Sequence, residues 1–255
     1  MISATAPTDD RLATARSAAA RPAPSRHRLL ALAGTAGLLL GTAACGSDGG
    51  GTGAAGAGRL SYDQARSTAQ DLSESGPCPF GLDLAAALKG AGVDLPVTAG
   101  AKGHPTAETE VEAEVPAQPW PSGATPPAGI PSIPATPARA WVTCHFTAGA
   151  TPVRVDLLAL AEHGPAISLM LPHIQRFGNL GVDQLQDFAD RQPTTGQTEV
   201  TPGGGLVGVS RPAVRGKGDL ALTLTQTTGE APTEPALTGE PLRRVTERLA
   251  AQLRP

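Results

Sequence analysis

The sequence predicts an α+β fold, in which an antiparallel sheet of about four or five strands packs against helices. Apolar and polar residues alternate over 140–146, and a second strand over 153–161 follows a short turn, as in a β-hairpin. The strands 205–210 and 219–226 are expected to form a second hairpin. Segments with helical spacing of apolar residues flank and separate these pairs, so the expected order is α-α, β-β, α, β-β, α.

Two helices are expected before the sheet. The first covers residues 62 to about 75, and Ser61 and Gln64 at its start have the spacing of a capping box. The second is short, over residues 82–88, and it follows a turn that contains Cys78. Both present small apolar residues on one side, which favours packing against a sheet.

The strand over 140–146 has the clearest alternation in the chain. Cys144 shares its core-facing side with Val142 and Phe146. His145 alternates to the outward side, where we expect a surface residue.

Three further helical segments are expected, over 164–178, 182–189 and 242–253. Pro172 should kink the first of them, because a proline within a helix lacks the backbone N–H that the helix needs. A pocket between this kinked helix and the sheet would favour small-molecule or lipid binding, whereas a filled core would favour a protein-interaction module. The side chains expected there are Leu169, Leu171, Ile174 and Phe177.

Residues 96–138 are expected to form a disordered insertion. They contain ten prolines among small residues, and this composition is typical of mobile segments with polyproline II character. Val111 and Val115 alternate with glutamates and would suit a short exposed strand, but the proline content favours the insertion. The second half of the stretch, 122–138, has two interpretations, plain disorder and a glycosylated linker.

The first 44 residues are expected to be a signal peptide. A twelve-residue apolar run, 29–40, follows three arginines, and small residues precede Cys45. The run is too short for a transmembrane helix, which needs about 20 apolar residues. Two alternatives remain for Cys45, a lipidated N-terminus and a free thiol in a secreted chain.

The stretch Thr42-Ala43-Ala44-Cys45, followed by Gly46 and Ser47, resembles the lipobox of bacterial lipoproteins. Thr42 stands where that family usually has Leu, Val or Ile. The resemblance implies that Cys45 is diacylated and anchors the mature chain to the outer face of the cell membrane after export by the general secretory route. The Gly-rich residues 45–60 would then tether a single domain, 61–255, to the bilayer.

Cysteine count and charge narrow the remaining possibilities. Cys78 and Cys144 are left once Cys45 is set aside, and two cysteines in an oxidising compartment most simply form one disulfide. The chain has 20 basic and 23 acidic residues, and the leader holds five of the basic and two of the acidic ones. The mature chain is therefore acidic, and nucleic acid is not an expected partner.

The sequences Gly76-Pro77-Cys78-Pro79-Phe80 and Trp141-Val142-Thr143-Cys144-His145-Phe146 resemble the paired-cysteine core of a group of actinobacterial secreted lipoproteins. The resemblance covers about residues 62–160. It implies a disulfide between the two cysteines and an α+β fold, and it carries over no catalytic residues.

The sequence contains no motif of a common catalytic or metal site. Its histidines lack metal-ligand spacing, and His163 and His173 lie too far apart along a helix to share a metal. Neither Ser168 nor Ser210 lies in a nucleophile elbow. We interpret the acidic helix face formed by Asp183, Asp187 and Asp190 as solvated. The basic hairpin tip formed by Arg211, Arg215 and Lys217 is a candidate contact for anionic headgroups.

We therefore expect a lipid-anchored extracytoplasmic binding or interaction domain of the cell envelope, without catalytic activity, cofactor or metal. Its partner would be an envelope protein, lipid or glycan, and the lipid on Cys45 would hold it at the membrane. The alternative is an envelope hydrolase with a nonstandard site, which a buried acid or histidine with a perturbed pKa in a cleft would favour.

Overall fold

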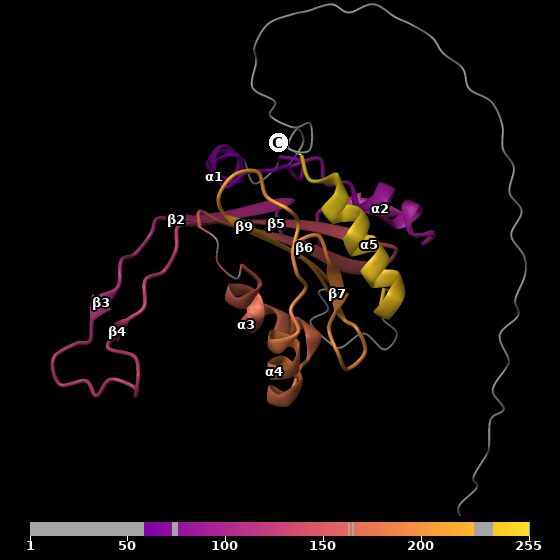
Figure 1. The fold of residues 1–255 in the computed structure, drawn as a ribbon. Helices are drawn as coiled ribbons and strands as arrows, with labels where there is room; N and C mark the ends of the chain where they lie inside the picture. Colours follow the sequence, from indigo (N-terminus) through magenta and orange to yellow (C-terminus); the bar gives the residue numbers. More distant parts are fainter. Residues whose placement is uncertain (1–58, 73–75, 163, 165, 227–236, 255) are drawn as a thin grey trace, which may run out of the picture. The chain divides into compact units, whose positions relative to one another are not determined.

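The structure is a computed structural model that describes residues 59–72, 76–162, 164, 166–226 and 237–254. The expected signal peptide, Cys45 and His163 lie outside these residues. Within them the chain forms five helices: α1 (Tyr62–Asp71), α2 (Leu84–Gly90), α3 (Ala166–Gly178), α4 (Val182–Asp190) and α5 (Gly239–Gln252). The strands described there (Figure 1) are β1 (Val97–Ala99), β2 (Ala107–Glu112), β3 (Gln118–Pro119), β4 (Ser132–Ile133), β5 (Arg139–Ala148), β6 (Thr151–Leu160), β7 (Thr198–Val200), β8 (Val207–Ser210) and β9 (Asp219–Gln226).

Seven of these strands form one antiparallel sheet. Its order is β1-β5-β6-β9-β8-β7, and β2 pairs with β5 on the same side as β1. Both predicted hairpins are present, as β5–β6 and β8–β9. The α+β class is thus confirmed, and the sheet has more strands than the four or five expected because β1, β2 and β7 extend it.

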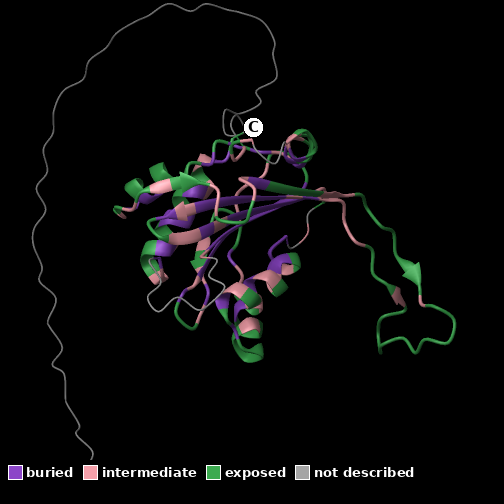
Figure 2. Ribbon diagram, turned by 180° about the vertical axis from the view of Figure 1, so that it is seen from behind, coloured by how far each residue is buried: buried purple, intermediate pink, exposed green. Residues whose placement is uncertain are grey.

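Helices cover both faces of the sheet (Figures 1 and 2). On one face, α1, α2 and α5 pack on a core built from alternate residues of β5, β6 and β9. On the other face, α3 and α4 enclose a smaller core with β6, β8 and β9. The part of this second face that belongs to β5 and β2 lies beside α3, and its polar side chains form the site described below.

The expectation of a disordered insertion over 96–138 is wrong for its first part, which forms β1 and β2. β2 pairs with β5 along its whole length. No proline lies between Pro105 and Pro116, so every residue of β2 keeps the backbone N–H that a sheet requires. The alternation of glutamates with apolar residues in this stretch therefore marks an edge strand, which the proline content of the longer segment obscured.

The rest of the insertion is an arm that projects from the sheet (Figures 1 and 2). β3 and β4 pair within it, and Val115 forms a bridge with Thr136 closer to the sheet. Trp120 Nε1 donates a hydrogen bond of 2.9 Å to the carbonyl oxygen of Ile130. The arm thus has a defined two-stranded form, although most of its side chains are exposed.

The predicted disulfide between Cys78 and Cys144 is confirmed. The two Cα atoms are 5.6 Å apart, and the bond links positions 66 residues apart. Cys144 lies on the core-facing side of β5, as its alternation predicts, so the disulfide ties the turn before α2 to the centre of the sheet. Leu60, expected at the end of the tether, is buried in the same core and belongs to the folded domain.

α1 begins where the sequence predicts. Gln64 N donates to Ser61 Oγ, and Ser61 N donates to the Gln64 side chain, which is the predicted capping box. The helix ends at Asp71, before the expected position 75, and residues 73–75 lie outside the described part of the chain.

α3 has two distinct faces. Ile167, Met170 and Ile174 recur at helical spacing and are buried against the sheet. Pro172 lies within the helix, as predicted, on the side that faces away from this core. The residues of that side follow the i, i+1, i+4, i+5 pattern of one helix face. They are Pro172, His173, Arg176 and Phe177.

Candidate functional site

A cleft of about 720 Å³ lies between α3 and the strands β5 and β6. Clefts of roughly 300–1,000 Å³ are typical of small-molecule sites. The cleft lies beside Pro172, where a pocket was considered. Of the side chains expected there Phe177 lines it, whereas Leu169 and Leu171 do not and Ile174 is buried in the core. The charged and aromatic side chains of the cleft are Lys102, His104, His145, Arg154, His173, Arg176 and Phe177.

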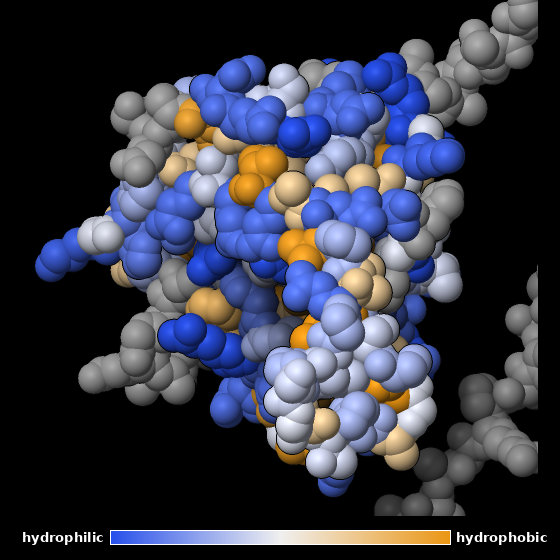
Figure 3. Space-filling model, turned by 90° about the vertical axis from the view of Figure 1, so that its left-hand side faces the viewer, coloured by the Kyte–Doolittle hydropathy of each residue, from blue (hydrophilic) through white to orange (hydrophobic). Residues whose placement is uncertain are grey.

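A second hollow of about 270 Å³ adjoins the cleft. It shares Arg154 and His173 with the cleft and is bounded by Glu108, Trp141 and Thr143. Figure 3 views the molecule from the side on which β3 and β4 lie in Figure 1, and hydrophilic residues predominate on the face that it shows.

The strand register places these polar side chains together. Glu108 on β2 lies opposite Thr143 on β5, and Thr143 lies opposite Asp156 on β6. Two residues further along β5, on the same face, His145 lies opposite Arg154. Because residues opposite each other in an antiparallel sheet point to the same face, all five side chains emerge beside α3.

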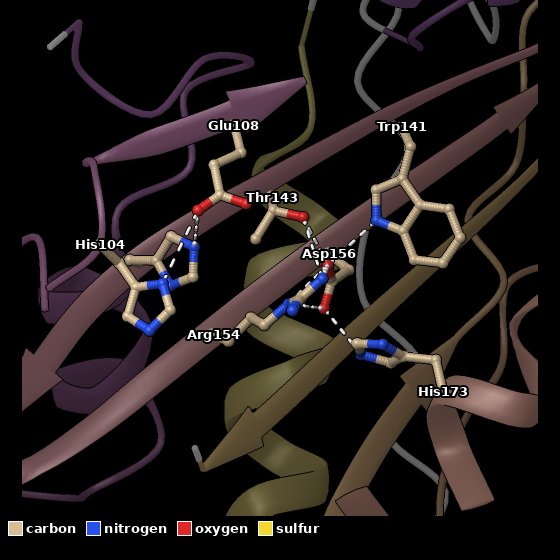
Figure 4. A network of polar contacts seen from close by, with 8 residues as sticks. His104, Glu108, Trp141, Thr143, Arg154, Asp156 and His173 are labelled. Carbon is tan, nitrogen blue, oxygen red and sulfur yellow. Dashed lines mark hydrogen bonds and ion pairs between the residues drawn. The ribbon is translucent and has the colours of Figure 1, made fainter. Parts of the chain in front are cut away.

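Asp156 is the centre of the polar network (Figure 4). Its side chain is fully buried, and it accepts hydrogen bonds from Trp141 Nε1 at 3.0 Å and Thr143 Oγ1 at 2.7 Å. Arg154 donates from Nε to both carboxylate oxygens, at 2.9 Å each, and from Nη2 at 2.7 Å. His173 Nε2 lies 3.0 Å from Oδ2. The carboxylate therefore accepts hydrogen bonds from β5 and β6 and forms an ion-pair contact with α3.

The electrostatics of Asp156 are decided by these partners. Burial alone would raise its pKa, because a carboxylate loses hydration in the interior. The ion-pair contact with His173, followed by the hydrogen bonds and charge of Arg154, outweighs the burial and holds the pKa well below its ordinary value. Asp156 is thus a permanent anion that fixes the positions of Arg154 and His173, not a proton acceptor at neutral pH.

An aromatic wall stands beside the two arginines. The guanidinium carbons of Arg154 and Arg176 each lie 5.7 Å from the centroid of the Phe177 ring. His173 contacts the same ring at a centroid distance of 4.5 Å and meets the edge of Trp141 at 5.8 Å. The arginine contacts are of the cation–π kind, the His173–Phe177 contact is tilted and the Trp141–His173 contact is T-shaped. Together they orient the side chains on the α3 side of the cleft.

A second cluster lies at the opposite end of the cleft and consists of His104, Glu108 and His145. Each offers one potential metal-ligand atom, and these atoms all lie within 4.8 Å of one another. The rings of His104 and His145 are stacked, with centroids 4.6 Å apart. This is the group of described residues that could hold a metal ion.

The expectation that His145 is a surface residue is wrong. It points away from the disulfide core, as alternation predicts, but only 2% of it is exposed. The reason is that β5 is an internal strand, with β1 and β2 on one side and β6 on the other, and the turn before β2 places His104 over its ring. Burial lowers the pKa of His145, and the nearby negative charge of Glu108 only partly opposes this.

The other residues weighed from the sequence lie outside the cleft. Asp183, Asp187 and Asp190 are exposed on α4, in line with a solvated helix face. The hydroxyl of Ser168 contacts Gln192 and that of Ser210 contacts Gln197, and neither lines the cleft.

The basic hairpin tip is less uniform than expected. Arg215 and Lys217 are exposed. Arg211 is instead bound to the buried carboxylate of Asp219, with Nε 2.8 Å from Oδ1. Asp219 also accepts a hydrogen bond of 2.8 Å from the backbone N–H of Ala166, so this pair holds the start of α3 against β9.

A scan of protein-family models, a search of curated proteins and a search of solved structures each found no match for this chain. In the part of the chain that the structure describes, no helix is both long enough and apolar enough to cross a membrane. The geometry of the cleft is therefore the basis for the function proposed next.

Proposed function

We propose that the protein is a lipid-anchored extracytoplasmic domain of the cell envelope that binds a small anionic molecule in the cleft beside α3. The observation that supports this most strongly is the arrangement of Arg154. Its guanidinium is held by a fully buried carboxylate and still borders a cleft large enough for a small molecule. A cation fixed in advance loses little conformational entropy when a ligand binds.

The charges around the cleft favour an anion. Arg154 contacts Asp156 through Nε and Nη2, and its Nη1 has no hydrogen-bond partner among the described residues. Lys102 and Arg176 likewise form no ion pair with any residue of the described ranges. Three cationic side chains therefore border the cleft, and of these Arg154 is paired with Asp156, while Glu108 lies at the far end beside His104 and His145. Guanidinium groups bind carboxylate and phosphate oxygens in a planar, bidentate manner.

The aromatic wall narrows the class of ligand further. Phe177 and His173 offer aromatic surface to a ligand that enters the cleft, and Trp141 bounds the adjoining hollow. A ligand with an oxyanion and a flat or apolar part would use both features. An aryl phosphate such as p-nitrophenyl phosphate has this composition and serves as a probe.

The probe is expected to bind saturably, and Arg176→Gln is expected to weaken its binding by about tenfold or more, the effect of one lost charge-assisted hydrogen bond. Arg176 is exposed, so the variant should fold normally. Isothermal titration calorimetry in the presence of EDTA measures the affinity. Arg66→Gln, the same charge change on α1 across the sheet, is the matched control and should bind like the wild type. Equal affinity in both variants, or no saturable binding, would contradict the proposal.

The anchor is tested separately. Protein recovered from membranes of the native host is expected to begin at Cys45 and to carry added acyl mass. Intact mass spectrometry measures this, and Cys45→Ser should move the protein into the soluble fraction. A mature, unacylated chain from the medium would show free secretion instead.

A hydrolase is the second candidate, because the cleft contains both a buried histidine with a lowered pKa and the Asp156–His173 pair. The hydroxyl of Thr143 donates to Asp156, so water rather than this side chain would have to attack the substrate. The same probe separates the candidates. Release of p-nitrophenolate that His173→Gln abolishes would replace binding with hydrolysis, and the absence of release supports a binding domain.

A further inference from the structure

We propose that His104, Glu108 and His145 form a binding site for a divalent transition-metal ion, best suited to zinc, at the end of the cleft opposite α3. The inference goes beyond anion binding and does not depend on it. It rests on the positions of three ligand atoms, on a buried histidine without hydrogen-bond partners and on the rigidity of the backbone around them.

The ligand atoms converge on one point. Glu108 Oε1 lies 3.2 Å from His145 Nε2 and 3.7 Å from His104 Nδ1. Both ring nitrogens thus approach the same carboxylate oxygen, as Figure 4 shows for Glu108 and His104. Ligand atoms about 2.0–2.2 Å from a tetrahedral zinc ion are roughly 3.3–3.6 Å apart. The two distances to Glu108 lie just on either side of that spacing, and the two imidazole nitrogens are within 4.8 Å of each other.

His145 is the second observation that points to a ligand. It is 98% buried, and neither of its ring nitrogens has a hydrogen-bond partner of suitable geometry in the described part of the chain. The contact of Nε2 with Glu108 has the length of an ion pair but not the direction of a hydrogen bond. A buried polar atom without a partner is costly, and coordination to a metal would satisfy it.

The backbone holds the three residues firmly. The backbone of His145 is hydrogen-bonded to both ends of the segment that leads into β2. Gly100 N donates to the carbonyl oxygen of His145, and His145 N donates to the carbonyl oxygen of Thr106. Glu108 follows two residues later, in the paired part of β2. His104 is exposed on the turn, so its ring can leave the stack and adjust to an ion with little cost.

The ligand types identify the class of ion. Two imidazoles and one carboxylate are a ligand set of zinc sites, whereas calcium and magnesium prefer oxygen atoms alone. Three protein ligands leave a fourth position. His104 and His145 border the same cleft as Arg154 and Arg176, so that position is open to water or to an oxygen of a bound anion.

Zinc binding to the full chain is tested by competition with a chromophoric chelator, after treatment with EDTA and its removal. The wild type is expected to bind one zinc ion per chain. His104→Gln and Glu108→Gln should each weaken binding at least tenfold. Glu110→Gln is the matched control, because it removes a carboxylate from the same face of β2 two residues away. Cobalt(II) added in place of zinc should give the visible absorption of a tetrahedral site with nitrogen and oxygen ligands.

His145→Gln is expected to abolish binding, and circular dichroism shows whether this buried variant folds. The exposed His104 and Glu108 variants keep the test decisive if it does not. Zinc binding that all three substitutions leave unchanged, or less than stoichiometric binding by the wild type, would overturn the proposal. Anion binding measured in EDTA is unaffected by either result, so the two proposals can fail independently.

Discussion

Asp156→Asn is expected to lower the free energy of unfolding by about 3–5 kcal/mol, the usual cost of removing one partner from a buried ion pair. The amide has nearly the same shape as the carboxylate but no charge. It would leave Arg154 and His173 without their anion in a site where Asp156 is fully buried. Urea unfolding followed by circular dichroism measures the change. Asp187→Asn, on the exposed side of α4, is the control and should alter stability by about 0.5 kcal/mol or less.

Asp156 should also determine how the stability of the protein changes as the pH falls. The pKa of Asp156 is lower in the folded protein than the value of about 4 of an unfolded aspartate. Its contribution is therefore fully present above about pH 4 and is lost as the pH falls from there toward the lower folded value. The wild type should lose stability more steeply below pH 4 than Asp156→Asn does. Parallel acid curves for the two proteins would contradict the assigned role of this carboxylate.

Loss of the disulfide is expected to have a comparable effect. The bond joins Cys78 and Cys144, which are 66 residues apart, and a closed loop of this length restricts the unfolded chain by about 4 kcal/mol in the chain-entropy model. A domain of this size should then melt roughly 8–16 °C lower after reduction. Differential scanning calorimetry with and without reductant measures the shift.

The double variant Cys78→Ala, Cys144→Ala provides the control for the reductant. It should melt at the temperature of the reduced wild type, and reductant should not lower it further. Cys144 is buried, so part of any difference between the two would come from the atoms that alanine removes. A reduced wild type that melts like the oxidised protein would show that the bond contributes nothing to stability.

Local sequence patterns were sufficient for most of the fold. Alternation over 140–146 and the turn after it identified the first hairpin, and the second was predicted over 205–226. The Ser61–Gln64 spacing identified the start of α1, and the cysteine count identified the disulfide. β2 was missed because the proline content of the longer segment outweighed its local alternation, and its pairing with β5 cannot be seen in the local sequence. β7 was missed because three residues are too short for a periodicity.

The candidate site was much harder to predict from the sequence than the fold. Asp156 and Arg154 look like ordinary members of an alternating strand, and only the register of β5 against β6 shows that they meet Thr143 and His145. His104 and Glu108 are four residues apart, but His145 comes from a distant part of the chain. The available signal was the presence of charged and histidine residues within strands that are otherwise strongly apolar, since such residues are seldom buried without partners.

The central claim is that the cleft between α3 and the sheet binds an anion. It is tested most directly by NMR of the arginine Nε–Hε groups during titration with p-nitrophenyl phosphate in EDTA. The account predicts saturable shifts of the signals of Arg154 and Arg176, with the signal of Arg66 unchanged. Shifts confined to other arginines, such as Arg243 and Arg244 on α5, would place the binding site elsewhere and contradict it.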